Sequence, residues 1–167
     1  TERKRFVQKK VKLSDFRIRD FSFDIMKEDR VVKEECRIDF RNMVSARGEL
    51  VMLPLHLFTN ELRMPGRTRD RNQDFYVRRG YVDQCTVRYN LPPGYEVKSL
   101  PGKAELESEY GTFTMKTTLE EGQLVLHRKL QVNPGDYPVA QYGEFFGFFR
   151  EIDRADHRSV VLSRTKP

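Results

Sequence analysis

Apolar and polar residues alternate over much of the first ninety positions, and this pattern predicts short β-strands. Phe16 and Ile18 alternate with arginines, and the apolar positions then shift by one residue at Phe21. Because neighbouring side chains of a strand point to opposite faces, this shift indicates a β-bulge, which we place near Asp20. After a turn at 27–30 the alternation resumes over 32–40, which predicts the partner strand.

A third strand is predicted between Val51 and Leu57, where leucines and valines occupy every second position. Pro54 lies within it and has no backbone N–H to donate, so it favours an edge or a bulge at that point. The segment 60–72 is polar, irregular and rich in arginine, and we expect it to be a loop. Further strands are predicted at 75–77 and 81–89.

The second half of the chain has two hairpin signals, followed by one helical pattern. Tyr110–Gly111 and Glu120–Gly122 separate three strand-like segments. Arg128 interrupts the apolar face of the last segment, so we expect it to be paired across the sheet or to lie at a rim. From residue 139 the apolar period becomes helical, and one stripe collects five large residues. The stripe consists of Tyr142, Phe145, Phe146, Phe149 and Ile152.

Short strands with turn signals between them are typical of a β-sandwich. We therefore expect a mainly β fold, an antiparallel β-sandwich with one amphipathic helix near the C-terminus, at 139–154. Residues 1–12 are expected to be a linker or edge segment, and 13–167 a single domain of a larger protein. No apolar run approaches membrane-spanning length, so membrane insertion is not expected.

Charge adds one candidate binding segment. The chain has 31 basic and 25 acidic side chains, a formal net charge of +6, and the two kinds are interleaved almost everywhere. One arginine-rich segment at 63–79 departs from this mixture and could bind a polyanion or a glycan, because guanidinium groups suit phosphate and carboxylate. Nucleic acid is the less favoured ligand, because few aromatic residues there could stack on bases. The candidates are Arg63, Arg67, Arg69, Arg71, Arg78 and Arg79.

The sequence offers little catalytic chemistry. Cys36 and Cys85 occupy apolar positions of alternating segments, so we expect buried thiols, with a disulfide as the alternative if their strands are neighbours. His56 and His127 fall on outward positions of their strands. We find no metal-ligand spacing, phosphate loop or nucleophile motif, and therefore expect no catalytic residue, no metal and no cofactor.

Three features of the C-terminal half carry a family resemblance: LPPGY at 91–95, RKL at 128–130, and YPVAQYGEFFGFFREIDRADHRSVVL at 137–162. With them, residues 71–163 resemble the C-terminal domain of bacterial multi-domain proteins that have a transglutaminase-like core. The first 60 residues share only the strand pattern. In that family the catalytic Cys, His and Asp belong to the core, so no catalytic position transfers to this chain.

The resemblance implies a non-catalytic accessory domain of an exported, periplasmic or cell-envelope protein, some relatives of which are named as proteases. Its implied partner is the preceding transglutaminase-like core of the same polypeptide. If that core packs here, apolar surface should be exposed, and we expect it at Tyr137 and Phe148. The alternative function is a polyanion- or glycan-binding module that uses the segment 63–79.

Overall fold

The computed structural model describes residues 5, 7, 9–11, 15–40, 45–47, 49–57, 65–66 and 71–165. The chain separates into two compact units, each defined by contacts within itself. Unit 1 comprises residues 1–45 with 57–60, and unit 2 comprises 46–56 with 61–167. The sequence pattern did not predict these two units, and the single domain over 13–167 stays a prediction.

Unit 1 contains an antiparallel hairpin of β1 (Phe16–Met26) and β2 (Val31–Phe40), joined by the expected turn at 27–30. The register between the two strands shifts between Ile18 and Asp20, which confirms the predicted bulge. The described residues before the hairpin differ from the linker or edge segment expected for 1–12. Arg5, Val7, Lys9 and Lys10 are helical.

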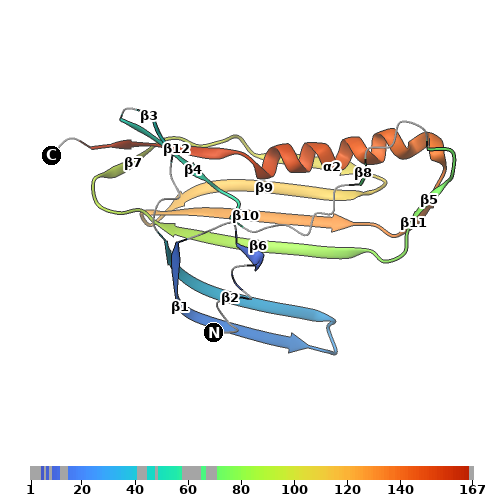
Figure 1. Cartoon of the computed structure of the whole chain (residues 1–167), viewed down its shortest axis with the longest axis horizontal. Helices are drawn as coiled ribbons and strands as arrows, with labels where there is room; N and C mark the ends of the chain where they lie inside the picture. Colours follow the sequence, from blue (N-terminus) through green and yellow to red (C-terminus); the bar gives the residue numbers. More distant parts are fainter. Residues whose placement is uncertain are drawn as a thin grey trace. The chain divides into compact units, whose positions relative to one another are not determined.

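Unit 2 is built on two four-stranded sheets, and all the strand pairs described within them are antiparallel (Figure 1). The strand order is β6-β10-β9-β8 in the first sheet and β3-β4-β12-β7 in the second. A short pair, β11-β5, forms a third pairing. The strands are β3 (Ser45–Arg47), β4 (Leu50–Pro54), β5 (Phe75–Val77), β6 (Tyr81–Asn90), β7 (Tyr95–Ser99), β8 (Ala104–Ser108), β9 (Gly111–Glu120), β10 (Gln123–Val132), β11 (Gly135–Tyr137) and β12 (Ser159–Arg164).

Both predicted hairpin turns of the first sheet are confirmed. Strands β8 and β9 close on the pair Ser108–Gly111, and β9 and β10 close on Glu120–Gln123. The two residues between β9 and β10, Glu121 and Gly122, have φ angles of 48° and 80°. Two consecutive positive φ angles define the type I′ turn, whose twist matches that of the flanking strands.

The helix α2 (Tyr142–Asp156) follows a short 3-10 turn, η1 (Val139–Gln141), and packs against β8 (Figure 1). Buried side chains of β9 and β10, such as Phe113, Met115 and Leu126, form the core of unit 2. Between the sheets, the hydroxyl of Tyr89 on β6 donates a hydrogen bond of 2.6 Å to the carbonyl oxygen of Leu55, which follows β4. The expected fold, an antiparallel β-sandwich with one amphipathic helix near the C-terminus, is confirmed.

Pro54 is the last residue of β4, which pairs with both β3 and β12. It therefore ends a strand inside the sheet instead of marking an edge strand. Within the described part of the chain, no helix is both long enough and apolar enough to cross a membrane.

Candidate functional site

Three of the six predicted arginines fall in the described residues, and all three are exposed. Arg71 precedes β5, while Arg78 and Arg79 lie in the connection from β5 to β6. Among the described residues, no carboxylate lies within ion-pair distance of these guanidinium groups. The other three candidates, Arg63, Arg67 and Arg69, lie outside the described residues.

Two of these arginines are held against aromatic rings. The Arg78 guanidinium carbon lies 5.1 Å from the ring centroid of Tyr76, and Nη2 donates a hydrogen bond of 3.1 Å to the Tyr76 hydroxyl. The Arg71 guanidinium carbon lies 4.5 Å from the Tyr142 centroid, and its Nε donates to the carbonyl oxygen of Gln73 at 3.0 Å. Stacking on a ring orients a guanidinium group and leaves N–H donors on its edge available.

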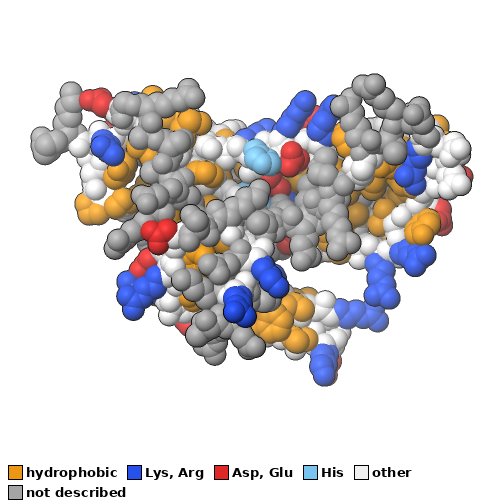
Figure 2. Space-filling view, in the orientation of Figure 1, with side chains coloured by type: hydrophobic (Ala, Val, Ile, Leu, Met, Phe, Trp, Pro, Cys, Tyr) orange, Lys and Arg blue, Asp and Glu red, His pale blue; other side chains and the backbone are white. Residues whose placement is uncertain are grey.

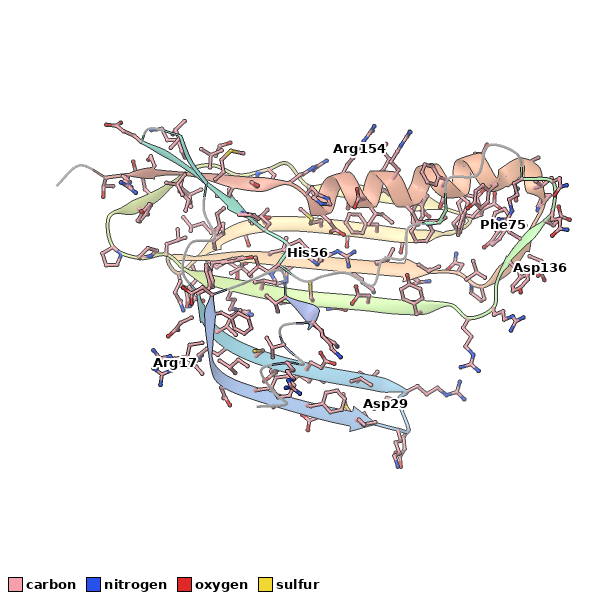
Figure 3. All side chains as sticks on the ribbon, in the orientation of Figure 1. Arg17, Asp29, His56, Phe75, Asp136 and Arg154 are labelled. Atoms are coloured by element: carbon pink, nitrogen blue, oxygen red, sulfur yellow. The ribbon has the colours of Figure 1, made fainter. Side chains whose placement is uncertain are left out.

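The frame beneath Arg78 and Arg79 is tightly packed. Strand β5 pairs with β11, so that Tyr76 lies opposite Asp136. A Cβ atom on Gly80 would lie only 2.7 Å from both Pro134 Cδ and the Val132 carbonyl oxygen. Figure 3 shows Phe75 of β5 and Asp136 of β11 at the same end of unit 2. Arg78 and Arg79 therefore lie in a connection whose backbone packs closely against Val132 and Pro134.

The expected exposure of Tyr137 and Phe148 is wrong. Tyr137 is 7% exposed and Phe148 8% exposed. The Tyr137 ring stacks on Phe75 with centroids 5.3 Å apart, and the Phe148 ring meets Phe149 edge to face at 5.5 Å. Both side chains belong to an aromatic core between β5, β11 and α2. Neither can contribute to an exposed apolar patch.

The helical stripe is also shifted from the one expected. Phe145, Phe149 and Ile152 are buried as predicted, but Phe146 is only half-buried and Phe148 takes its place in the core. Buried positions 145, 148, 149, 152, 155 and 156 follow the i, i+3, i+4, i+7 pattern of a helix face. Phenylalanine occupies both the predicted position, Phe146, and the observed one, Phe148, so the spacing alone could not show which of the two faces the core.

Arg128 is the most buried charged residue that the structure describes, and it forms a bidentate ion pair with Asp156. Its Nε donates to Asp156 Oδ1 at 2.7 Å and its Nη2 to Oδ2 at 2.9 Å, while Nη1 reaches Asp83 Oδ2 at 2.9 Å. The guanidinium carbon also lies 5.2 Å from the Phe113 ring centroid. This confirms that Arg128 is paired. Its partners are Asp156, the last residue of α2, and Asp83 on the neighbouring strand β6.

Burial lowers the pKa of Arg128, but the hydrogen bonds and charge of Asp156 outweigh it and the net pKa is raised. The pair thus lies in the interior of unit 2, with no exposed area on the Arg128 side chain. Three N–H groups of this buried guanidinium are already taken up by the two carboxylates. Its geometry is that of a structural clamp between β10 and the C-terminal end of α2.

The cysteines differ from expectation in one respect. Cys85 on β6 is half-buried directly opposite Arg128, and burial raises the pKa of its thiol to about 11. Cys36 on β2 is exposed, so its expected burial is wrong. Both cysteines are free thiols. A thiol with a pKa near 11 is almost entirely protonated at neutral pH and is a weak nucleophile.

Of the two histidines predicted to be exposed, one is exposed and the other is buried. His127 is exposed on β10, as predicted, and its Nδ1 lies 3.3 Å from the Thr86 hydroxyl. His56 is buried at 9% exposure, and its expected outward position is wrong. The cause is that β4 ends at Pro54, so alternation no longer applies and Leu55, His56 and Leu57 are all buried. The described residues contain no group of three or more His, Cys, Asp or Glu placed to hold a metal ion.

A second exposed surface lies on the hairpin of unit 1, and we call it the hairpin face. Because of the bulge, the cross-strand pairs Phe16–Phe40, Ile18–Ile38, Phe21–Cys36, Phe23–Glu34 and Ile25–Val32 all point to one side. Its one acidic member, Glu34, is paired with Lys10 Nζ at 2.6 Å. Toward the turn this face is open to solvent, with exposures of 45% for Phe23, 59% for Ile25 and 55% for Val32.

The opposite side of the hairpin is charged. Arg19 Nη2 lies 2.5 Å from Asp39 Oδ2, and Lys33 Nζ lies 2.7 Å from Glu35 Oε1. A hairpin with one charged side and one apolar side normally buries the apolar side against another layer.

The family model of DUF3858, a domain of unknown function with a solved structure, matches residues 49–162. The chain belongs to this family. The match begins at β4 and ends within β12, so it includes α2 but leaves out β3 and the hairpin of unit 1. Among curated proteins, no match is found.

One solved structure shares the fold. It is a protein from Parabacteroides distasonis described as a "putative protease", and it superposes with a TM-score of 0.57 at 14% sequence identity. The match covers 68% of this chain and 23% of the other. This chain therefore spans about a quarter of the length of the protein it resembles, and the likeness establishes the fold alone.

Proposed function

We propose that this DUF3858 chain is a non-catalytic interaction domain of a larger exported protein with a transglutaminase-like core, and that it acts by packing on its neighbouring domain. One observation carries the proposal. The same fold occupies 23% of a longer solved protein that is described as a "putative protease". A fold that accounts for so small a share of a chain is a component of a larger assembly, and the sequence resemblance suggests what the rest contains.

The chemistry of unit 2 is consistent with this role. Arg128 and Asp156 are committed to each other, and the Cys85 thiol is protonated at neutral pH because burial raises its pKa to about 11. Residues that are buried, paired or protonated in this way stabilise a fold but do not attack a substrate. We therefore propose that any peptidase or acyl-transfer activity belongs to the neighbouring domain.

The hairpin face is the proposed contact surface. A two-stranded hairpin alone is marginally stable in water, and it needs further packing on its apolar face. Ile25 and Val32, more than half exposed, are partners across the strands of this face. The hairpin lies outside the residues that the family model matches, so the DUF3858 fold does not require it. We propose that the occupant of the hairpin face is an apolar surface of the neighbouring domain in the same polypeptide.

Cross-linking of the complete gene product tests this contact. The double substitution Ile25→Glu and Val32→Glu places two charges on the hairpin face and should reduce cross-links from Lys27 to the neighbouring domain by about tenfold or more. The control is Ser22→Glu with Lys33→Gln, which makes the same change of two charge units on the opposite side of the hairpin. Equal cross-linking in wild type and both variants would contradict the proposal.

The envelope location stays a prediction that rests on the resemblance. Fractionation of cells that produce the complete gene product tests it directly. Recovery outside the cytoplasm is the expected result, and recovery with cytoplasmic markers would contradict it.

A further inference from the structure

The β5–β6 connection presents charge and an aromatic ring on the same side of the chain. Tyr76 is 57% exposed, and Arg78, two residues later, extends along the same face. Phe75, on the other side of β5, is buried and contacts Phe145 with ring centroids 4.9 Å apart. Alternation thus anchors one side of β5 in the aromatic core and leaves the other side to solvent. Figure 2 shows basic and hydrophobic side chains together at this end of unit 2.

The guanidinium groups there are available for an anion. Arg78 is oriented by the Tyr76 ring at 5.1 Å, Arg79 is exposed beside it, and neither has a carboxylate partner among the described residues. An arginine carries five N–H donors, and the Tyr76 hydroxyl takes only one from Arg78. The Gly80 backbone packs closely against Pro134, so the backbone next to the two arginines has little freedom to move. Such pre-organisation lowers the entropy lost on binding.

The third group of the surface is Asp136, which lies opposite Tyr76 in the β5–β11 pair and is exposed. Residues directly opposite in an antiparallel pair point to the same face, so this carboxylate lies on the same face as the Tyr76 ring. A carboxylate accepts hydrogen bonds from hydroxyl groups and repels phosphates. It therefore suits a ligand that carries hydroxyl groups as well as anionic groups.

We infer that Tyr76, Arg78, Arg79 and Asp136 form a binding site for an acidic polysaccharide, a chain whose sugars carry carboxylate or sulfate. The arginines bind the anionic groups through charge-assisted hydrogen bonds, and Asp136 accepts hydrogen bonds from sugar hydroxyls. The negative face of the Tyr76 ring packs against the C–H groups of a sugar ring. Arg71, exposed and held on Tyr142 4.5 Å away, adds a further cation that a long polymer can reach. This site is independent of the hairpin face.

Titration calorimetry on the 167-residue chain tests the site with four probes. These are oligogalacturonate, which carries carboxylates, a heparin oligosaccharide, which carries sulfates, neutral dextran, and oligo-dT. At least one of the two acidic glycans should bind, with an affinity that falls as salt rises. Tighter binding of the first would identify carboxylate as the recognised group, and tighter binding of the second would identify sulfate. Dextran should not bind, and oligo-dT should bind more weakly than the better glycan.

Matched variants separate a site from general basic charge. Arg78→Ala with Arg79→Ala should weaken binding about tenfold or more. Arg17→Ala with Arg37→Ala removes the same charge from exposed positions of the hairpin and should change binding less than about twofold. Tyr76→Ala should also weaken binding, and Tyr76→Phe, which keeps the ring, should retain most of it. Equal losses in both arginine pairs, tighter binding of oligo-dT, or no binding of either acidic glycan at about 1 mM would overturn the inference.

Discussion

Arg128 and Asp156 hold each other through two hydrogen bonds of 2.7 and 2.9 Å, and so join the middle of β10 to the last residue of α2. The Arg128 side chain has no exposed area and that of Asp156 is 7% exposed. Such a pair is costly to break but not necessarily stabilising overall, because both groups lose their hydration when the chain folds. Its main consequence is positional, since it fixes where the helix ends over the sheet.

Removal of one partner should be strongly destabilising. Arg128→Ala leaves the Asp156 carboxylate buried without its cation, and we expect the free energy of unfolding to fall by about 3–5 kcal/mol. The double substitution Arg128→Met with Asp156→Leu should recover most of this loss, because it removes both charges. Urea denaturation measures both. The control is Arg154→Ala, because Figure 3 shows Arg154 pointing away from the sheet, and it should cost less than about 0.5 kcal/mol. An Arg128→Ala variant as stable as wild type would contradict this structural role of the ion pair.

The helix core gives a second prediction, which depends on the phase of the stripe. Phe149→Ala should destabilise unit 2 by about 3–5 kcal/mol, since its buried ring meets Phe145 at a centroid distance of 4.9 Å. Phe148→Ala should cost a similar amount, and Phe146→Ala clearly less, because Phe146 is half-buried. Thermal unfolding of the three variants checks the order. A larger loss for Phe146 than for Phe148 would mean that the helix is rotated.

Two glycine substitutions should have opposite effects. Gly111 has a φ of 150°, and a Cβ there would lie 1.9 Å from the Gln131 carbonyl oxygen, so Gly111→Ala should destabilise the β8–β9 hairpin. A Cβ on Gly147 in α2 would have no neighbour within 4 Å, so Gly147→Ala should stabilise the helix by about 1 kcal/mol. Chemical denaturation of both variants is the measurement. A neutral Gly111→Ala would contradict the tight turn.

Cys85 predicts how stability depends on alkaline pH. Its pKa is raised from 9.0 to about 11 in the folded chain by burial, so the folded state holds this proton more tightly than the unfolded state does. The resulting stabilisation is complete below about pH 9 and is lost as pH rises toward 11. Cys85→Ser should flatten the decline between these values.

A thiol reagent at neutral pH should modify Cys36 quickly and Cys85 slowly, and equal rates would contradict this difference in exposure.

Local patterns predicted much of the fold. The bulge at Asp20 followed from a one-residue shift in apolar parity, and the turn at Glu121–Gly122 from its glycine between two strand-like segments. Each of these features depends on neighbours in sequence, so one sequence suffices to find it. Arg128 was predicted to be paired across the sheet or to lie at a rim, because a cation on an apolar strand face requires one or the other, and the first alternative holds.

Burial that depends on distant segments was harder to predict. Tyr137 lies in a short segment with no period of its own, and only its pairing with Phe75 on β5 shows that it is buried. His56 is buried because the strand ends at Pro54, three residues before the predicted end at Leu57. Arg78 was found from composition, but Asp136, opposite Tyr76, comes near it only through strand pairing between segments 60 residues apart in sequence.

The central claim, that this domain works by packing on a neighbour, is tested most directly by hydrogen exchange. Backbone amides of β1 and β2 should exchange more slowly in the complete gene product than in the 167-residue chain, because the neighbouring domain covers the hairpin face. The amides of β9 and β10, already paired on both sides, serve as the internal reference and should exchange alike in both. Equal exchange of β1 and β2 in the two proteins, or a complete gene product without a further domain, would contradict the claim.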